Sequence, residues 1–101
     1  MEVVIQDSGE VKTISITGEI DLYSSPDLKK KIMGLVKKKE KEILVDFANV
    51  SYIDSSGIAT LVEALKGMMG YGGVLTFINL NNDIKEVFSF ARLDKIFNIT
   101  G

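Results

Sequence analysis

The stretch ILVDFANVSYIDSSGIATL, residues 43–61, begins as a nearly continuous apolar run and changes into a helical pattern. The run at residues 43–47 is typical of a central strand covered on both faces. After Ser55, apolar residues recur with the spacing of a helix that extends to about Met69. A buried strand that leads into a helix favours an α/β fold. The Asp-Ser-Ser-Gly junction between the two, residues 54–57, is the candidate functional segment.

The rest of the chain alternates strands with helices. Residues 2–5 and 11–17 are β-branched or alternate with a period of two, which predicts an N-terminal antiparallel hairpin. Further elements are expected as a helix that starts at the candidate N-caps Ser24 and Ser25, a strand at residues 74–80, a helix that starts near residues 81–83 and a strand at residues 95–99. This order predicts one domain over residues 1–101, with a mixed, mainly parallel sheet of four to five strands and helices packed on it.

The composition excludes several classes of function. The 101 residues include no Cys and no His, which removes disulfides, thiolate zinc sites and every Ser-His-Asp arrangement. A net charge of −2 argues against a nucleic-acid partner. No apolar run approaches the roughly 20 residues that span a bilayer, and the N-terminus lacks a signal-peptide pattern. We therefore expect a cytoplasmic protein without membrane contact, enzymatic activity, cofactor or metal.

A metal site is the weaker alternative for the acidic residues. Four carboxylates stand near the ends of expected strands: Glu19, Asp21, Asp46 and Asp54. No calcium-loop spacing connects them, and a magnesium site usually needs substrate phosphates as well.

Small residues mark one face of the helix that follows Asp54. At 100° per residue, the expected core face holds Ile58, Leu61, Val62, Leu65, Met68 and Met69. The opposite face, here called the small-residue face, holds Ser56, Ala59, Thr60, Glu63, Ala64 and Gly67. A solvent face normally carries several long charged side chains. We therefore predict that the small-residue face is open to the backbone of a partner.

The start of this helix has little stabilising chemistry of the usual kind. None of residues 57–59 can close a capping box, and Gly57 costs about 1 kcal/mol relative to Ala. Free N–H groups and the helix dipole favour an anion at such an end. A phosphate on a serine there would add roughly −1.5 to −2 charges beside Asp54. On the residues alone, plain N-capping and a phosphorylation switch both stay open.

The junction at residues 54–58, together with Gly-Glu-Ile-Asp at residues 18–21, resembles the STAS domain of bacterial anti-sigma factor antagonists. The strand at residues 43–47, an expected turn at 50–53 and the segment 92–97 fit the family in order, so the resemblance covers almost the whole chain. The departures are Asn82, where the family often has Pro, Ala91 and Arg92 in place of Ser-Gly, and the end at Gly101, where relatives often continue into another helix. The early end implies either that part of the sheet is less covered or that the chain is a compact variant of the family.

The resemblance implies a partner-switching mechanism. In the family, the unmodified antagonist binds an anti-sigma factor that is also a serine kinase, and so frees a sigma factor. The kinase phosphorylates the serine that follows the Asp, and a metal-dependent serine/threonine phosphatase reverses this. Here the implied phosphosite is Ser55, and the kinase brings ATP and magnesium. The implied partner-binding residues are Gly18, Glu19, Asp21, Asp54, Ser56, Gly57, Ile58 and Thr60. A monomer or weak dimer is expected.

Three other functions compete with this interpretation. Acyl carriers attach phosphopantetheine to a Ser in Asp-Ser at a helix start, but they are all-helical and the strands expected here oppose that. A small hydrolase with Ser55 or Ser56 as nucleophile would need a Lys base, because the chain has no His. A STAS domain in another signalling or transport-regulation assembly stays open.

Overall fold

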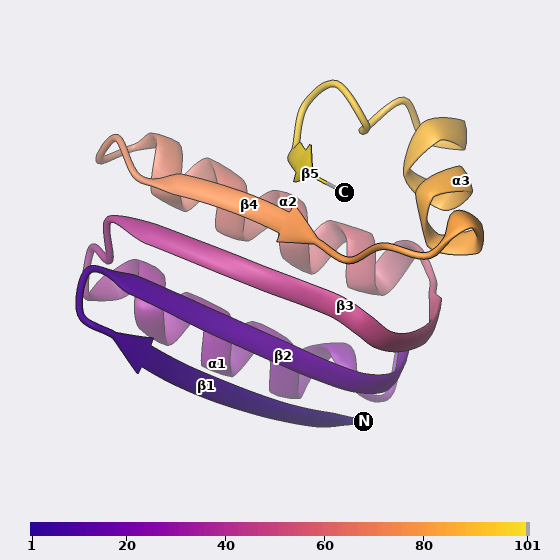
Figure 1. The fold of residues 1–101 in the computed structure, drawn as a ribbon, viewed down its shortest axis with the longest axis horizontal. Helices are drawn as coiled ribbons and strands as arrows, with labels where there is room; N and C mark the ends of the chain where they lie inside the picture. The colour runs from indigo at the N-terminus through magenta and orange to yellow at the C-terminus, as the bar shows by residue number, and fades with distance from the viewer. Residues whose placement is uncertain (101) are drawn as a thin grey trace.

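A computed structural model describes residues 1–100, which form a five-stranded sheet in the order β1-β2-β3-β4-β5 with three helices (Figure 1). The strands are β1 Glu2–Ser8, β2 Val11–Ile20, β3 Glu42–Ile53, β4 Val74–Ile78 and β5 Asn98–Thr100, and the helices are α1 Ser25–Lys37, α2 Ser55–Met69 and α3 Asn82–Phe90. β1 pairs antiparallel with β2, and all other pairs are parallel. The predicted mixed, mainly parallel sheet with an N-terminal hairpin is confirmed. Gly101, the last residue of the expected domain, lies outside the described residues.

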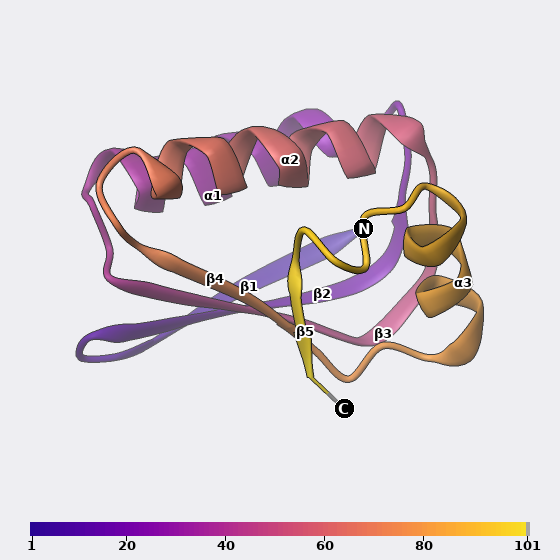
Figure 2. The ribbon, with the colours of Figure 1, turned by 90° about the horizontal axis from the view of Figure 1, so that it is seen from above.

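The helices are distributed unevenly around the sheet. α1 and α2 lie side by side on one face, and α3 lies at one end of the sheet, beside the end of β3 (Figure 2). No helix within residues 1–100 covers the opposite face (Figure 2). The core lies between the sheet and the helices, and α3 joins it through Phe88. The Phe88 ring packs within 6.1 Å of Phe47 and 5.5 Å of Phe77, measured between ring centroids.

Two strands extend further than the sequence predicts. Residues 50–53, expected as a turn, belong to β3, and β2 continues from Thr17 to Ile20. The two extensions pair with each other, Gly18 with Val50 and Ile20 with Ile53, across shifts in register. Gly18 has φ +103°, a conformation that side chains rarely adopt. The irregular register hides these residues from a period-two pattern.

The C-terminal boundaries also differ from the expectation. β4 ends at Ile78 rather than at residue 80, and Asn79 follows with φ +60°. The last strand is Asn98–Thr100 rather than residues 95–99.

The expectation that the small-residue face of α2 is open to a partner is wrong for Thr60, Ala64 and Gly67, whereas Ala59 and Glu63 of that face are exposed. Thr60 and Ala64 are buried, and a Cβ on Gly67 would lie only 2.7 Å from Val36 Cγ1 of α1. Met69, expected in the core, is 68% exposed. α2 contacts the sheet on one side and α1 on another, so its buried surface is wider than a single stripe. The small residues allow close approach of a helix of the same chain.

Candidate functional site

Asp54 joins two segments that are distant in sequence. Its backbone is extended, and its Oδ1 accepts hydrogen bonds from the N–H of Ser56 at 2.9 Å and of Gly57 at 3.2 Å. Its Oδ2 accepts from the N–H of Leu22 at 3.2 Å, and its own N–H donates to the Ile20 carbonyl at 3.1 Å. One carboxylate thus fastens the segment after β2 to the start of α2. The expectation that this helix start has little stabilising chemistry is therefore wrong.

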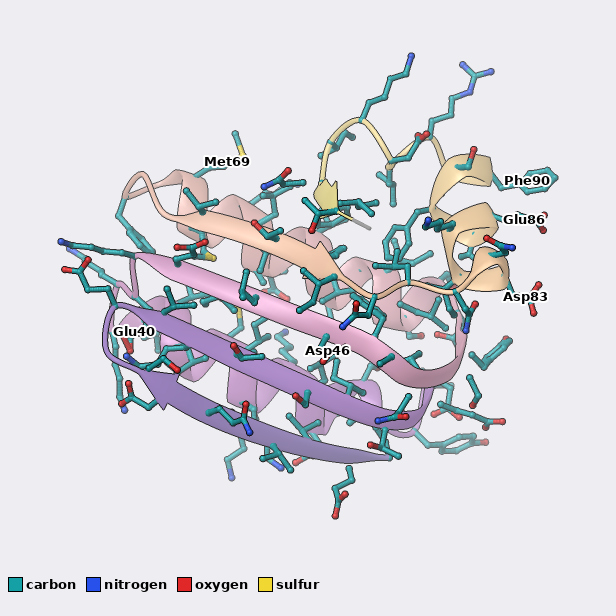
Figure 3. The ribbon with its side chains drawn as sticks, in the orientation of Figure 1. Glu40, Asp46, Met69, Asp83, Glu86 and Phe90 are labelled. Carbon is teal, nitrogen blue, oxygen red and sulfur yellow. The ribbon has the colours of Figure 1, made fainter. Side chains whose placement is uncertain are left out.

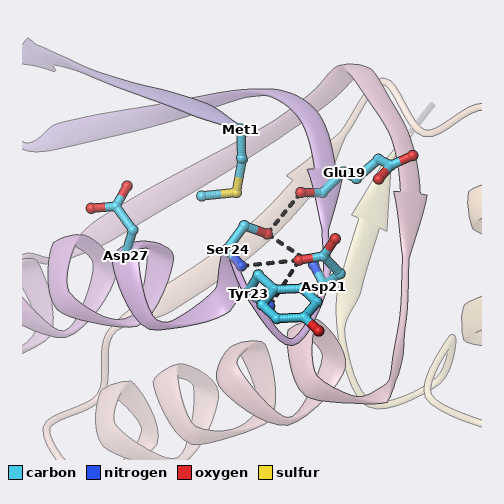
Figure 4. Close-up of a pocket in the computed structure, with 6 residues that line it drawn as sticks. All are labelled: Met1, Glu19, Asp21, Tyr23, Ser24 and Asp27. Carbon is cyan, nitrogen blue, oxygen red and sulfur yellow. Dashed lines mark hydrogen bonds between the residues drawn. The ribbon is translucent and has the colours of Figure 1, made fainter.

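The segment at residues 21–24, here called the β2–α1 loop, is held by its own side chains. Asp21 Oδ1 accepts from the N–H groups of Tyr23 at 2.9 Å and Ser24 at 3.0 Å. Ser24 Oγ accepts from the Asp21 N–H at 2.9 Å and donates to the Glu19 carbonyl at 2.8 Å (Figure 4). The hydrogen bonds from the backbones of Ser24 and Tyr23 lower the pKa of Asp21. Ser24 stands at the N-cap position of α1, but its hydroxyl bonds within the loop rather than to the helix.

Ser55 and Ser56 differ in exposure. Ser55, the first residue of α2, is exposed, whereas Ser56 is half-buried. The neighbouring Gly57 is buried, and a Cβ there would lie 2.6 Å from Ile20 Cγ2 and 2.8 Å from Ile53 Cγ1. Only glycine lets α2 begin this close to the ends of β2 and β3. Ser55 directly follows Asp54, whose Oδ2 accepts the hydrogen bond from Leu22 of the β2–α1 loop.

A hollow of about 450 Å³ lies between the start of α2 and α3. Its lining includes Ser55, and its apolar walls come mainly from Ile58, Val87 and Phe90. Its acidic members are Asp54, Asp83 and Glu86, and the lining contains no Lys or Arg. Figure 3 shows the side chains of α3 at the end of the molecule opposite Met69.

The α3 residues that line this hollow are not among the site residues predicted from the sequence. Positions 83, 86 and 90 stand at i, i+3 and i+7, so their spacing places them on one face of a helix. Phe90 is 90% exposed. The i, i+3, i+7 spacing is therefore the sequence pattern that indicates this face of α3.

The structure brings together only part of the predicted partner-binding set. Glu19, Asp21, Asp54, Ser56 and Ile58 lie at the end of the molecule where β2 ends and α2 begins. Thr60 is only 6% exposed, and its hydroxyl donates to the Ser56 carbonyl at 3.1 Å. Gly57 is buried as well, and Gly18 lies within β2 beside Val50. Thr60 and Gly57 therefore offer no exposed side chain to a partner.

Three of the four carboxylates considered for a metal, those of Asp21, Asp46 and Asp54, accept hydrogen bonds from groups of the same chain. Asp46, in the middle of β3, accepts hydrogen bonds from the Ala48 N–H at 2.9 Å and the Asn79 side-chain amide at 3.2 Å. Within residues 1–100, no three Cys, His, Asp or Glu side chains gather where they could hold a metal ion. No helix in the same range is long and apolar enough to cross a membrane.

Comparison with known proteins identifies the family. The model of the STAS domain matches residues 2–100. The chain is 32% identical over 87 residues to an anti-sigma-B factor antagonist of Bacillus subtilis, spanning 86% of this chain and 79% of that protein. An anti-sigma factor antagonist from Mycobacterium paratuberculosis has the same fold, with a TM-score of 0.88 at 21% identity over 97% of this chain and 83% of the other. Phosphorylated SpoIIAA, a Bacillus cell fate determinant, also has this fold, with a TM-score of 0.78 at 20% identity over 99% of this chain and 92% of the other. The chain therefore belongs to the STAS domain family.

Proposed function

We propose that this chain is an anti-sigma factor antagonist that is switched off by phosphorylation at Ser55. In the unphosphorylated state it binds an anti-sigma factor that is also a serine kinase, and so releases a sigma factor. The relative from Bacillus subtilis is named for antagonism of an anti-sigma factor, and SpoIIAA exists in unphosphorylated and phosphorylated forms. The observation that carries the proposal is the exposed Ser55, directly after the Asp54 that joins the β2–α1 loop to α2.

Ser55 fits the role of an acceptor in phosphoryl transfer. Such a transfer depends on positioning the hydroxyl in line with the phosphate and on charge stabilisation by magnesium and basic groups. The chain holds the backbone of Ser55 in place through Asp54, whose two oxygens accept three backbone hydrogen bonds. The kinase supplies the ATP, the magnesium and the base. The chain is thus a substrate and a binding partner rather than an enzyme, and it acts in the cytoplasm as a monomer or weak dimer.

The surroundings of Ser55 explain how a phosphate would act as a switch. A phosphate adds about −1.5 to −2 charges at neutral pH. The hollow beside Ser55 already contains the carboxylates of Asp54, Asp83 and Glu86, and no lining residue is basic. Within this hollow, the added charge would therefore have no Lys or Arg of this chain to neutralise it. It would repel acidic groups of a partner and raise the cost of desolvating the interface.

The test is to incubate the protein with ATP and the candidate kinase from its own cell, and to measure intact mass. We expect a single added phosphate, absent from Ser55→Ala and present in the matched control Ser56→Ala. A serine/threonine phosphatase of the metal-dependent class from the same cell should remove it. Loss of the phosphate in Ser56→Ala instead would refute the assignment to Ser55.

A further inference from the structure

Two large apolar side chains are turned to solvent in the β2–α1 loop. Leu22 is 65% exposed and Tyr23 is 90% exposed. Apolar surface that stays in water contributes nothing to the hydrophobic stabilisation of the fold. A single exposed apolar residue is ordinary, but these two are adjacent and stand on a loop that is bonded to Asp54, the residue before Ser55.

The loop that carries these side chains is fixed by hydrogen bonds along its length. The N–H of Asp21 donates to Ser24 Oγ, that of Leu22 to Asp54 Oδ2, and those of Tyr23 and Ser24 to Asp21 Oδ1. The N–H of Ser25 donates to the Asp21 carbonyl at 2.8 Å. Every backbone N–H from Asp21 to Ser25 therefore has an acceptor. A loop that is ordered before binding loses less conformational entropy when a partner docks.

Acidic groups surround the exposed pair. A hollow of about 570 Å³ beside Tyr23 is lined by Met1, Glu19, Asp21, Tyr23, Ser24 and Asp27 (Figure 4). Three of these residues carry carboxylates, the lining has no Lys or Arg, and its one cationic group is the ammonium of Met1, whose charge helps to lower the pKa of Asp21. Asp27 pairs with Lys31 at 3.3 Å, but Glu19, Asp21 and Asp54 form no ion pair with any residue in the range 1–100. Charge complementarity therefore calls for a cationic surface on the partner.

We propose that Leu22 and Tyr23 are the apolar anchor of the docking surface, and that the partner receives them in an apolar pocket bordered by Lys or Arg. This inference rests on the proposed function, takes the anti-sigma factor kinase as the occupant, and adds two residues that sequence analysis did not include. Tyr is among the residues that dominate binding energy in interfaces, and charged groups at a rim mainly steer association. The backbone of Leu22 is bonded to Asp54, the residue before Ser55, so a phosphate on Ser55 would add charge to the same docking surface.

The test is calorimetric titration of the unphosphorylated protein with its kinase. Leu22→Ala and Tyr23→Ala should each weaken binding by at least about tenfold, as expected for an interface anchor. Met69→Ala is the matched control, because Met69 is 68% exposed and lies at the far end of α2, 15 residues long, from Ser55. It should change the affinity by less than about twofold, as surface substitutions usually do. All three variants should keep the wild-type melting temperature, since each removes an exposed side chain.

The outcomes separate this inference from the proposed function. If the kinase neither binds nor phosphorylates the wild type, the proposed function fails. If it binds and phosphorylates the wild type but binds Leu22→Ala and Tyr23→Ala as tightly as Met69→Ala, only the anchor is overturned.

Raising the salt concentration should weaken wild-type binding, because screening reduces attraction between exposed charges. An affinity that does not change with salt would overturn the cationic border of the pocket.

Discussion

The Asp54 carboxylate accepts a hydrogen bond from the N–H of Leu22, 32 residues earlier in the chain, with 3.2 Å between Oδ2 and the nitrogen. Its other oxygen caps α2 through the N–H groups of Ser56 and Gly57. The side chain therefore sets the position of the β2–α1 loop relative to the helix that begins with Ser55. The proposed acceptor and the proposed anchor are held together by the same carboxylate.

Asp54→Ala should destabilise the protein by roughly 1–2 kcal/mol, because it removes the N-cap of α2 and the acceptor of the Leu22 N–H. Asp54→Asn is the matched variant. Asn is as good an N-cap as Asp, so it should retain most of the cap and lose less stability. Urea denaturation measures both free energies of unfolding. An Ala variant as stable as the wild type would show that the bonds of Asp54 contribute nothing.

Gly57→Ala and Gly34→Ala should have opposite effects on stability. A Cβ at Gly57 would collide with Ile20 and Ile53, and overpacking of this kind costs about 1–3 kcal/mol. A Cβ at Gly34, in the C-terminal half of α1, would have no atom within 4 Å, so the gain in helix propensity of about 0.5–1 kcal/mol should appear in full. Thermal and urea unfolding of the two variants test this. A stabilised Gly57→Ala would contradict the close approach of α2 to the strand ends.

Thr60→Ala should lower stability without changing the affinity for the partner. Thr60 is buried against the rest of the chain and its hydroxyl bonds the Ser56 carbonyl, so we expect a loss of about 1 kcal/mol. Ala59→Lys, at the exposed neighbouring position, should change the free energy of unfolding by less than about 0.5 kcal/mol. Urea denaturation and calorimetric titration with the kinase measure the two properties. Weaker binding of a folded Thr60→Ala variant would show that Thr60 belongs to the docking surface.

The order of strands and helices could be predicted because hydrophobic periodicity reports local structure directly. The role of the small-residue face could not. Periodicity shows that Thr60 and Gly67 share a helix face, but it does not show that α1 fills the space beside them. The bond between Asp54 and Leu22 joins positions 32 residues apart and has no local signal. The Asp-Ser-Ser-Gly junction could be recognised because its pattern is local: a strand, an N-cap and a helix start in consecutive residues. The choice of Ser55 as the phosphosite is implied by the resemblance to the STAS family and stays a prediction.

Asp21 should make the free energy of unfolding depend on pH in the acid range. Hydrogen bonds from the backbones of Ser24 and Tyr23 hold the pKa of Asp21 below its ordinary value of 3.8. The carboxylate therefore stabilises the folded state above pH 3.8, and this contribution is lost as pH falls through the lower pKa of the folded protein. Urea denaturation at neutral and acid pH should show that Asp21→Asn loses less stability on acidification than the wild type. Parallel curves for the two proteins would contradict this assignment.

Ser55→Asp should weaken binding to the kinase by about tenfold or more, because like charges placed against a partner are costly. Ser55→Ala should bind as the wild type does and remain insensitive to ATP. Ser55→Asn separates the effect of charge from the effect of size, since Asn matches Asp in size and carries no charge. Calorimetric titration of the three variants should rank Asn near Ala and well above Asp in affinity. If Asn weakens binding as much as Asp, then bulk at Ser55, and not repulsion beside Asp54, Asp83 and Glu86, operates the switch.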